Sequence, residues 1–137
     1  RPAVAVNHVP MADLSKYCSL KAEPIRDNYY YVDDMIEKPK PGQEFSNLSI
    51  LGRVLLTPEI YSILEHTKPG AGGEIQLTDA MAEYARAKGV TAVDFTGKRY
   101  DMGNKLGVMQ AQVETALKHP EIGEAFRAYL KELAATL

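Results

Sequence analysis

The chain has 137 residues, about the length of one domain, and its 45% apolar and 25% charged residues are typical of a globular protein. Its 16 Lys and Arg against 18 Asp and Glu give a formal net charge of −2, which excludes a long-range field that would attract nucleic acid or an anionic membrane. A single cysteine, Cys18, excludes an internal disulfide and a zinc site built from cysteines, and no apolar run approaches the roughly 20 residues of a membrane helix, so we expect a soluble, cytoplasmic domain with neither nucleic acid nor membrane as a partner.

The first residues do not resemble an ordinary start of a protein. The chain opens Arg1-Pro2-Ala3-Val4, with no initiator Met and no long apolar core of a secretory signal peptide. It enters Val4-Ala5-Val6 almost at once, as a chain does that begins inside a sheet. We therefore expect a fragment of a longer protein.

The first half of the chain is predicted to consist mainly of strands. Apolar, β-branched and aromatic runs between turn residues indicate extended segments, and Asp27-Asn28 before three tyrosines predicts a hairpin turn near Asp27. The expected elements are a buried strand at 2–9, one helical turn at 11–17, a hairpin over 19–32 that continues as a strand over 33–38, a loop at Pro41-Gly42 and a second buried strand at 48–56.

The second half is predicted to be mainly helical. Thr57-Pro58-Glu59 supplies an N-cap residue, a proline at the first helical position and an acid in the first turn. Gly89 is the expected stop of a later helix. From the spacing of apolar residues we expect a helix after Thr57, a loop at 69–73, a helix over 77–88, a strand over 90–95, a helix carrying Leu106, Met109, Val113 and Leu117, a break at His119-Pro120, and a last helix carrying Ile122, Phe126, Leu130 and Leu133.

This mixture of strands and helices indicates an α/β protein. We expect residues 1–137 to form a single partial domain. The closing segment, residues 104–137, is expected to be a helical cover over one face of the sheet.

Several residues could carry chemistry, and each also has a plain structural interpretation. The loop Pro69 to Gly73 could cradle a phosphate with its backbone amides, but it lacks the Gly-Lys-Ser/Thr ending of a P-loop and could simply connect two helices. The three histidines share no ligand spacing and are expected at the surface or at helix caps. Cys18 has no obvious base beside it and is expected to be a small buried hydrophobe.

Two further segments leave similar alternatives open. Glu37-Lys38-Pro39 places an acid and a base at the end of a strand, where Pro39 should hold Lys38 extended; a solvated charge pair would explain the pattern equally well. Tyr100 to Lys105 places a carboxylate just before a glycine and a helix, where either Asp101 or Asn104 could be the helix cap.

Four blocks of sequence, in their order, resemble bacterial UTP–glucose-1-phosphate uridylyltransferases (UDP-glucose pyrophosphorylases). The blocks are Ile36-Glu37-Lys38-Pro39 with Ser46 to Arg53, Leu56 to Ile60, Pro69 to Ala80, and Tyr100 to Gly107 with Gln110-Ala111 and Val113-Glu114. The resemblance covers roughly residues 9–130 and concerns only the C-terminal half of these enzymes. Their N-terminal glycine-rich loop and their first metal-binding aspartate have no counterpart here.

The resemblance implies the fold and activity of the family. It implies the C-terminal half of a nucleotide-diphospho-sugar transferase, a Rossmann-like mixed sheet with C-terminal helices. The whole enzyme would make UDP-glucose and pyrophosphate from UTP and glucose 1-phosphate, with Mg²⁺ as cofactor and as a homo-oligomer. The fragment alone is expected to be inactive.

The resemblance also implies roles for five residues. Glu37 would accept hydrogen bonds from glucose hydroxyls, and Lys38 would lie against the phosphate of glucose 1-phosphate. Asp101 would be one of two carboxylates near the Mg²⁺, and Gly103 would let the backbone come close to metal and phosphates. Glu74 would help to shape the sugar pocket, unless its block builds a subunit interface instead.

Two rival functions remain open from the sequence. The chain could be a non-catalytic sugar-phosphate-binding module derived from that family, or an oligomerisation domain. A glycine-rich Arg/Lys loop upstream in the parent gene would favour the enzyme over the binding module. The joint presence of Glu37, Lys38 and Asp101 argues against a purely structural domain.

Overall fold

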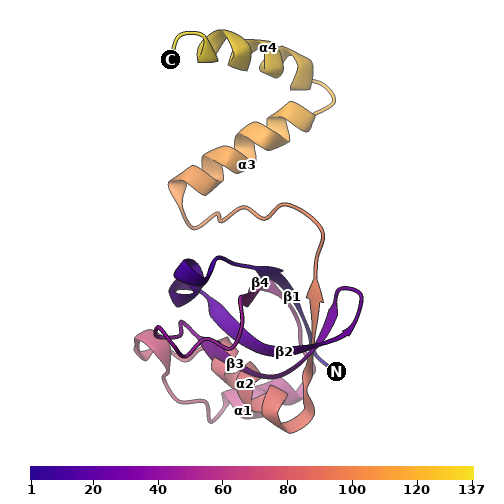
Figure 1. Cartoon of the computed structure of the whole chain (residues 1–137), viewed down its shortest axis with the longest axis vertical. Helices are drawn as coiled ribbons and strands as arrows, with labels where there is room; N and C mark the ends of the chain where they lie inside the picture. The colour runs from indigo at the N-terminus through magenta and orange to yellow at the C-terminus, as the bar shows by residue number, and fades with distance from the viewer. The chain divides into compact units, whose positions relative to one another are not determined.

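The computed structural model describes all residues, 1–137, and divides them into two compact units, Arg1–Thr96 and Gly97–Leu137. The first unit contains a five-stranded sheet, which confirms the expected α/β class (Figure 1). Its strands are β1 (Ala3–His8), β2 (Cys18–Arg26), β3 (Tyr29–Glu37), β4 (Leu48–Leu55) and β5 (Val90–Asp94). A short 3-10 helix at Met11–Lys16 precedes β2, where one helical turn was expected.

The sheet is mixed, with strand order β2-β3-β5-β1-β4. β1 lies between β5, to which it is parallel, and β4, to which it is antiparallel. β2 and β3 form the expected hairpin, and Asp27 in its turn adopts a positive φ of 43°. Asn28 follows Asp27 and donates from its side chain to the backbone oxygen of Asp94, at 2.8 Å. The hairpin is thereby attached to the end of β5.

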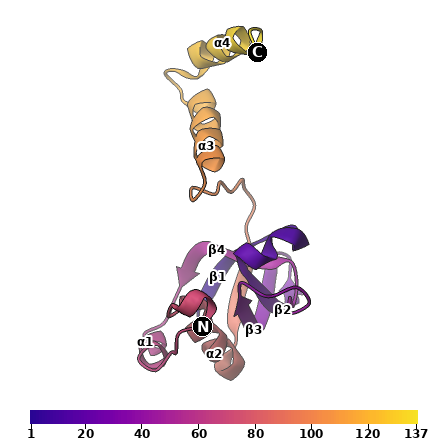
Figure 2. The same ribbon diagram turned by 90° about the vertical axis from the view of Figure 1, so that its left-hand side faces the viewer.

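Two α-helices, α1 (Glu59–Leu64) and α2 (Leu77–Lys88), and a short 3-10 turn at Ala71–Gly73 complete the first unit. The two α-helices pack against each other, and α2 also packs against β3 (Figure 2). α2 begins and ends where the sequence predicts, and Gly89 follows it with a φ of 73°. A Cβ at Gly89 would lie 2.3 Å from Cε2 of Tyr31, so glycine is required there by backbone conformation and by packing.

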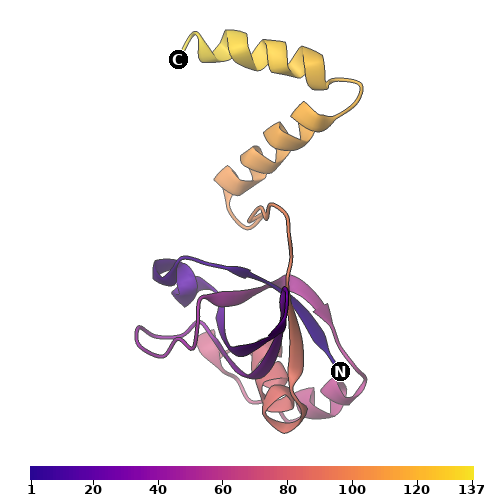
Figure 3. The same ribbon diagram turned by 45° about the vertical axis from the view of Figure 1, so that its right-hand side comes forward.

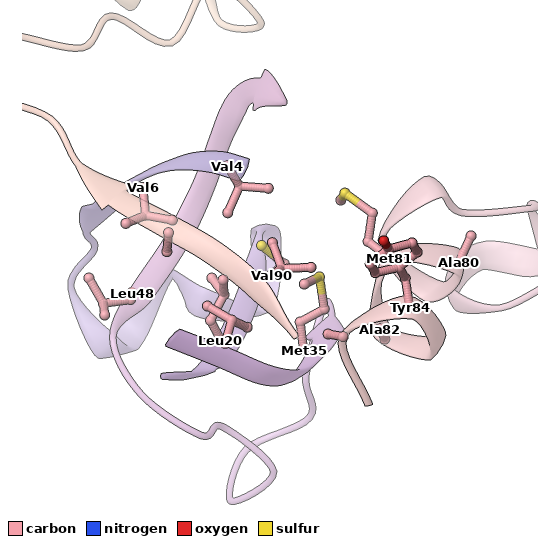
Figure 4. Close-up of a cluster of buried hydrophobic side chains, with 14 of the residues drawn as sticks. Val4, Val6, Leu20, Met35, Leu48, Ala80, Met81, Ala82, Tyr84 and Val90 are labelled. Atoms are coloured by element: carbon pink, nitrogen blue, oxygen red, sulfur yellow. The ribbon is translucent and has the colours of Figure 1, made fainter. Parts of the chain in front are cut away.

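The core lies between the strands and α2. Figure 4 shows side chains of the strands and of α2 in a single cluster. Its members are apolar and almost fully buried, among them Val4, Val6, Leu20, Val32, Met35, Leu48, Met81, Tyr84 and Val90. Burial of this kind stabilises a fold by about 1.5–3 kcal/mol for each large apolar side chain. The alternating strand residues and the α2 face therefore hold the first unit together.

The expectation that 48–56 forms a buried strand is wrong for its second half. β4 is an outer strand with β1 as its hydrogen-bonded neighbour. Leu48 and Ser49 are buried, whereas Val54 and Leu55 are 38% and 68% exposed. An apolar run has the same appearance in the sequence whether a strand lies inside a sheet or at its edge, so the pattern could not reveal this position.

The second unit contains two helices, α3 (Lys105–Lys118) and α4 (Gly123–Ala134). A short connection joins the end of α3 to the start of α4 (Figure 3). Asn104 caps α3: its side chain accepts from the N–H of Gly107 at 2.7 Å. His119 ends α3, as predicted, and its Nδ1 accepts from the N–H of Glu121. That residues 104–137 cover the sheet stays a prediction. No helix has both the length and the apolar character needed to cross a bilayer.

The start of α1 differs slightly from the expectation and contains an unusual carboxylate. The helix begins at Glu59 rather than Pro58, and the Thr57 hydroxyl donates to Glu59 Oε2 at 2.5 Å instead of capping a backbone N–H. Lys88 Nζ at the end of α2 donates to Glu59 Oε1 at 3.0 Å. The Thr57 hydrogen bond, and after it the Lys88 ammonium, lower the pKa of Glu59 to about 2.

We expect Glu59 to make stability depend on pH in acid. Because its pKa is lowered on folding, its contribution is present above the ordinary carboxyl range and is lost as the pH falls from about 4.5 to about 2. Urea unfolding of wild type and Glu59→Gln should therefore give a larger difference in unfolding free energy at pH 7 than at pH 2.5. Glu65→Gln, at the other end of α1, is the control. An equal difference at both pH values would contradict the prediction.

Candidate functional site

Glu37 and Lys38 lie where β3 ends. Glu37 is the last residue of the strand and pairs with Cys18 of β2. The Lys38 N–H donates to the backbone oxygen of Tyr17 at 2.8 Å. Pro39 is buried and Lys38 is exposed, so the proline anchors the segment while the lysine side chain reaches solvent.

The prediction that Pro39 holds Lys38 extended is wrong. Lys38 has a φ of 46°, in the left-handed region that residues other than glycine rarely occupy. A proline disfavours the right-handed helical region for the residue before it, which still leaves left-handed backbone open. Such a conformation costs about 1–3 kcal/mol and persists where neighbouring structure imposes it. Here the hydrogen bond to Tyr17 and the buried ring of Pro39 impose it.

A surface hollow of about 290 Å³ lies beside Glu37. Its walls come from the Lys16–Cys18 segment, from β4 and from the start of α2, including Thr78. The β4 and α2 side chains in the wall are mostly apolar: Ile50, Val54, Leu77 and Met81. The lining also contains Lys16, Tyr17 and Thr78 beside the carboxylate of Glu37. A mainly apolar wall with a few polar groups suits a sugar, which has apolar ring faces and hydroxyls that donate hydrogen bonds. Lys38 and Glu74 are not among the residues that line the hollow.

The glycine-rich loop before α2 is closed by its own hydrogen bonds. The N–H of Gly70 donates to the backbone oxygen of Glu74 at 2.8 Å, and the Gln76 side chain donates to the backbone oxygen of Ala71 at 3.0 Å. A Cβ at Gly70 would lie 2.0 Å from Oδ2 of Asp79, so that carboxylate lies directly over the loop. These contacts support the interpretation of the loop as a connection between α1 and α2. Glu74 itself is exposed, and Gln76 donates to its Oε2 at 3.3 Å.

Cys18 forms part of the wall of the hollow and of the core. Its Sγ lies 3.5 Å from the Ser49 hydroxyl and accepts from the N–H of Ile50 at 3.2 Å. Burial raises the pKa of the thiol above its ordinary value, which disfavours the reactive thiolate. Cys18 is thus the small buried residue that the sequence predicts.

Asp101 and Gly103 belong to the second unit, whereas Glu37, Lys38 and Glu74 belong to the first. Asp101 Oδ1 accepts from the N–H of Gly103 at 2.9 Å. A Cβ at Gly103 would lie 3.0 Å from that oxygen, so glycine lets the turn close tightly on the carboxylate. Of the two residues considered as the cap of α3, Asn104 fills that role.

The chain can offer a metal ion only part of a ligand set. No group of three or more His, Cys, Asp or Glu side chains lies together in residues 1–137. Mg²⁺ commonly takes one or two carboxylates and completes its shell with water and substrate phosphates. A single aspartate in a glycine-containing turn fits such an ion. Two of the three histidines have other contacts: His8 contacts Asn47 and Asp94, and His119 is the C-cap residue of α3.

Comparison with known proteins gives the family context. No protein-family model matches the chain. A UTP–glucose-1-phosphate uridylyltransferase 2 of Streptococcus pyogenes is 45% identical over 136 residues, covering 98% of this chain and 45% of that protein. The chain is homologous to part of these uridylyltransferases. A uridylyltransferase of Staphylococcus epidermidis is 43% identical over 130 residues and is also covered to 45%.

Solved structures give the same result for the fold. A UDP-glucose pyrophosphorylase complexed with UDP-glucose has a TM-score of 0.75 and 38% identity, over 96% of this chain and 44% of that one. A UTP-bound UGPase from Acinetobacter baumannii has a TM-score of 0.81 and 32% identity, with 96% and 45% covered. The resemblance to the C-terminal half of these enzymes is thereby confirmed, and the chain spans a little under half of their length.

Sequence reasoning missed two residues near Glu37 and Lys38 in the first unit, and one near Asp101 in the second. Tyr17 supplies the carbonyl that fixes Lys38, Thr78 faces the same hollow as Glu37, and Glu114 holds the segment before Asp101. Thr78 and Glu114 lie inside the blocks that carry the resemblance, so the sequence pointed to both residues but implied no function for either. Nothing in the sequence marks Tyr17, because it acts through its backbone.

Proposed function

We propose that this chain is the sugar-phosphate-binding part of an enzyme that makes UDP-glucose and pyrophosphate from UTP and glucose 1-phosphate. The observation that carries the proposal is Glu37 at the wall of an apolar hollow, next to an exposed Lys38 in a fixed backbone conformation. The names of the homologues support the choice of substrates.

In this proposal the chain positions one anion for attack on another. A phosphate oxygen of glucose 1-phosphate attacks the α-phosphorus of UTP, and pyrophosphate leaves. The attacking oxygen is already ionised, so no general base is needed. Catalysis then depends on orientation and charge neutralisation.

Each proposed site residue has a distinct task. Glu37 accepts hydrogen bonds from the glucose hydroxyls, and Glu74 helps to shape the sugar pocket. Lys38 supplies a compact positive charge to the sugar phosphate. The tight turn at Gly103 keeps the backbone near the phosphates free of a side chain.

We propose Mg²⁺ as the cofactor of the intact protein, with Asp101 as one of its ligands. When bound, the ion neutralises charge on the triphosphate. Asp101 offers a hard carboxylate oxygen, and the hydrogen bond from the Gly103 N–H orients it.

The substrate assignment predicts a clear preference in a panel of nucleoside triphosphates and sugar phosphates. The intact gene product should release pyrophosphate fastest from UTP with glucose 1-phosphate. Preference for dTTP, or for the phosphate of another sugar, would disprove the substrates while leaving the class of nucleotidyltransferase intact. No turnover with any pair would favour a non-catalytic binding module.

We further propose that the intact protein is a bacterial, cytoplasmic homo-oligomer. The streptococcal and staphylococcal homologues support the bacterial assignment. A cytoplasmic location follows from the proposed substrate, because UTP is made and used inside the cell. Light scattering on the intact gene product would determine the number of subunits.

A further inference from the structure

A carboxylate on α3 binds the segment that carries Asp101. Glu114, in the third turn of α3, accepts from Tyr100 Oη at 2.8 Å through one oxygen. Its other oxygen accepts from Lys98 Nζ. Lys98 Nζ also lies over the Tyr100 ring, 5.4 Å from its centre. The two residues that Glu114 holds come one and three positions before Asp101, so an anchored segment leads into Asp101.

A second contact fixes the backbone of Asp101 itself. Its carbonyl oxygen lies 2.0 Å from the position that a Cβ on Gly107 would take. Only glycine permits this approach of the segment to the first turn of α3. The side chain of Asn104, the N-cap of α3, accepts from the N–H of Gly107 at 2.7 Å. The chain is therefore fixed on both sides of Asp101, by the Tyr100–Glu114 hydrogen bond before it and by the Asn104 cap of α3 after it.

We propose that Glu114, acting through Tyr100, is a positioning residue that holds the Asp101 carboxylate where a divalent cation can use it. The inference rests on the proposed role of Asp101. Ligand oxygens must be placed to within a few tenths of an ångström, and partners behind a metal ligand typically change metal affinity by about 10–100-fold. Glu114 acts one step further back, because its two oxygens bind Lys98 and Tyr100 in the segment that leads into Asp101.

The test measures Mn²⁺ binding to the intact gene product by electron paramagnetic resonance, in the presence of UTP. Glu114→Ala and Tyr100→Phe should each weaken Mn²⁺ binding about tenfold. Excess Mg²⁺ should restore most of the turnover, so that the KM for Mg²⁺ rises while kcat changes little. Glu132→Gln, on α4 of the same unit, is the matched control. Tyr100→Phe removes one hydroxyl and keeps the ring, so it serves if Glu114→Ala fails to fold.

The variant Asp101→Asn distinguishes two hypotheses: the positioning role of Glu114, and the role of Asp101 as a metal ligand. If Asp101→Asn abolishes Mn²⁺ binding while Glu114→Ala and Tyr100→Phe bind as wild type, the positioning role is overturned and the role of Asp101 stands. If Asp101→Asn itself binds Mn²⁺ normally, both are overturned. A fall in kcat that excess Mg²⁺ does not relieve, with Mn²⁺ affinity unchanged, would also overturn the positioning role.

Discussion

Lys38→Ala in the intact gene product is expected to lower kcat/KM for uridylyl transfer about a hundredfold. On the proposed function, the variant leaves the phosphate of glucose 1-phosphate facing the triphosphate without its counter-charge. A charged contact of this kind is worth about 3 kcal/mol in the transition state, and each 1.36 kcal/mol is roughly tenfold in rate. The exposed side chain makes no contribution to the core, so the loss should appear in activity and not in stability.

Two further variants separate the lysine side chain from its unusual backbone. Lys38→Gly suits the positive φ of 46° and should fold well, yet it should be as inactive as Lys38→Ala. Lys40→Ala, which removes another exposed lysine two residues along the loop, should keep wild-type activity. Steady-state kinetics with glucose 1-phosphate as the varied substrate would measure all three. Near-normal turnover in Lys38→Ala would reduce Glu37-Lys38 to a solvated surface pair.

The parts of the fold that were predictable from sequence are those with a local physical cause. Gly89 ends α2 because it takes a positive φ, and the hairpin turns at Asp27 because aspartate tolerates the left-handed region. His119-Pro120 ends α3, because proline cannot continue a helix and disfavours helical backbone in the residue before it. Each of these depends on one or two neighbouring residues, which a reading along the chain can find.

The features that escaped prediction depend on contacts between distant segments. The exposure of Val54 and Leu55 follows from the place of β4 at the edge of the sheet, which the composition of the strand does not encode. The positive φ of Lys38 depends on a hydrogen bond to the carbonyl of Tyr17. Tyr17 comes just before β2, and the pairing of β2 with β3 in the hairpin brings it next to Lys38.

The candidate site was predictable only in part, for a similar reason. Its residue types came from the motifs, whereas the hollow that joins Glu37 to Thr78 arises from the packing of β3, β4 and α2. No local pattern places those two residues on one wall. The contact of Glu114 with Tyr100 likewise depends on how the segment before α3 folds back along that helix.

The 137-residue chain by itself is expected to retain its folded core. The first unit has a buried cluster shared by its strands and α2, and α3 has a satisfied N-cap. The outer strand β4 leaves Leu55 exposed, and an exposed apolar edge invites association. We therefore expect cooperative urea unfolding together with a concentration-dependent increase in apparent mass. Leu55→Lys should reduce that association, because a charge on an edge strand opposes edge-to-edge pairing.

The same chain is expected to show no uridylyltransferase activity. It spans about 45% of its uridylyltransferase homologues, and within it Asp101 is the one carboxylate that we propose as a ligand of the metal. A lone carboxylate holds Mg²⁺ weakly unless phosphates complete the shell, and Glu37 at an open hollow cannot exclude water from glucose 1-phosphate. The measurement is pyrophosphate release from UTP and glucose 1-phosphate, with calorimetry for each ligand and the intact gene product as the active control. Sustained turnover by a sample whose intact mass confirms 137 residues would show that these residues suffice for the reaction.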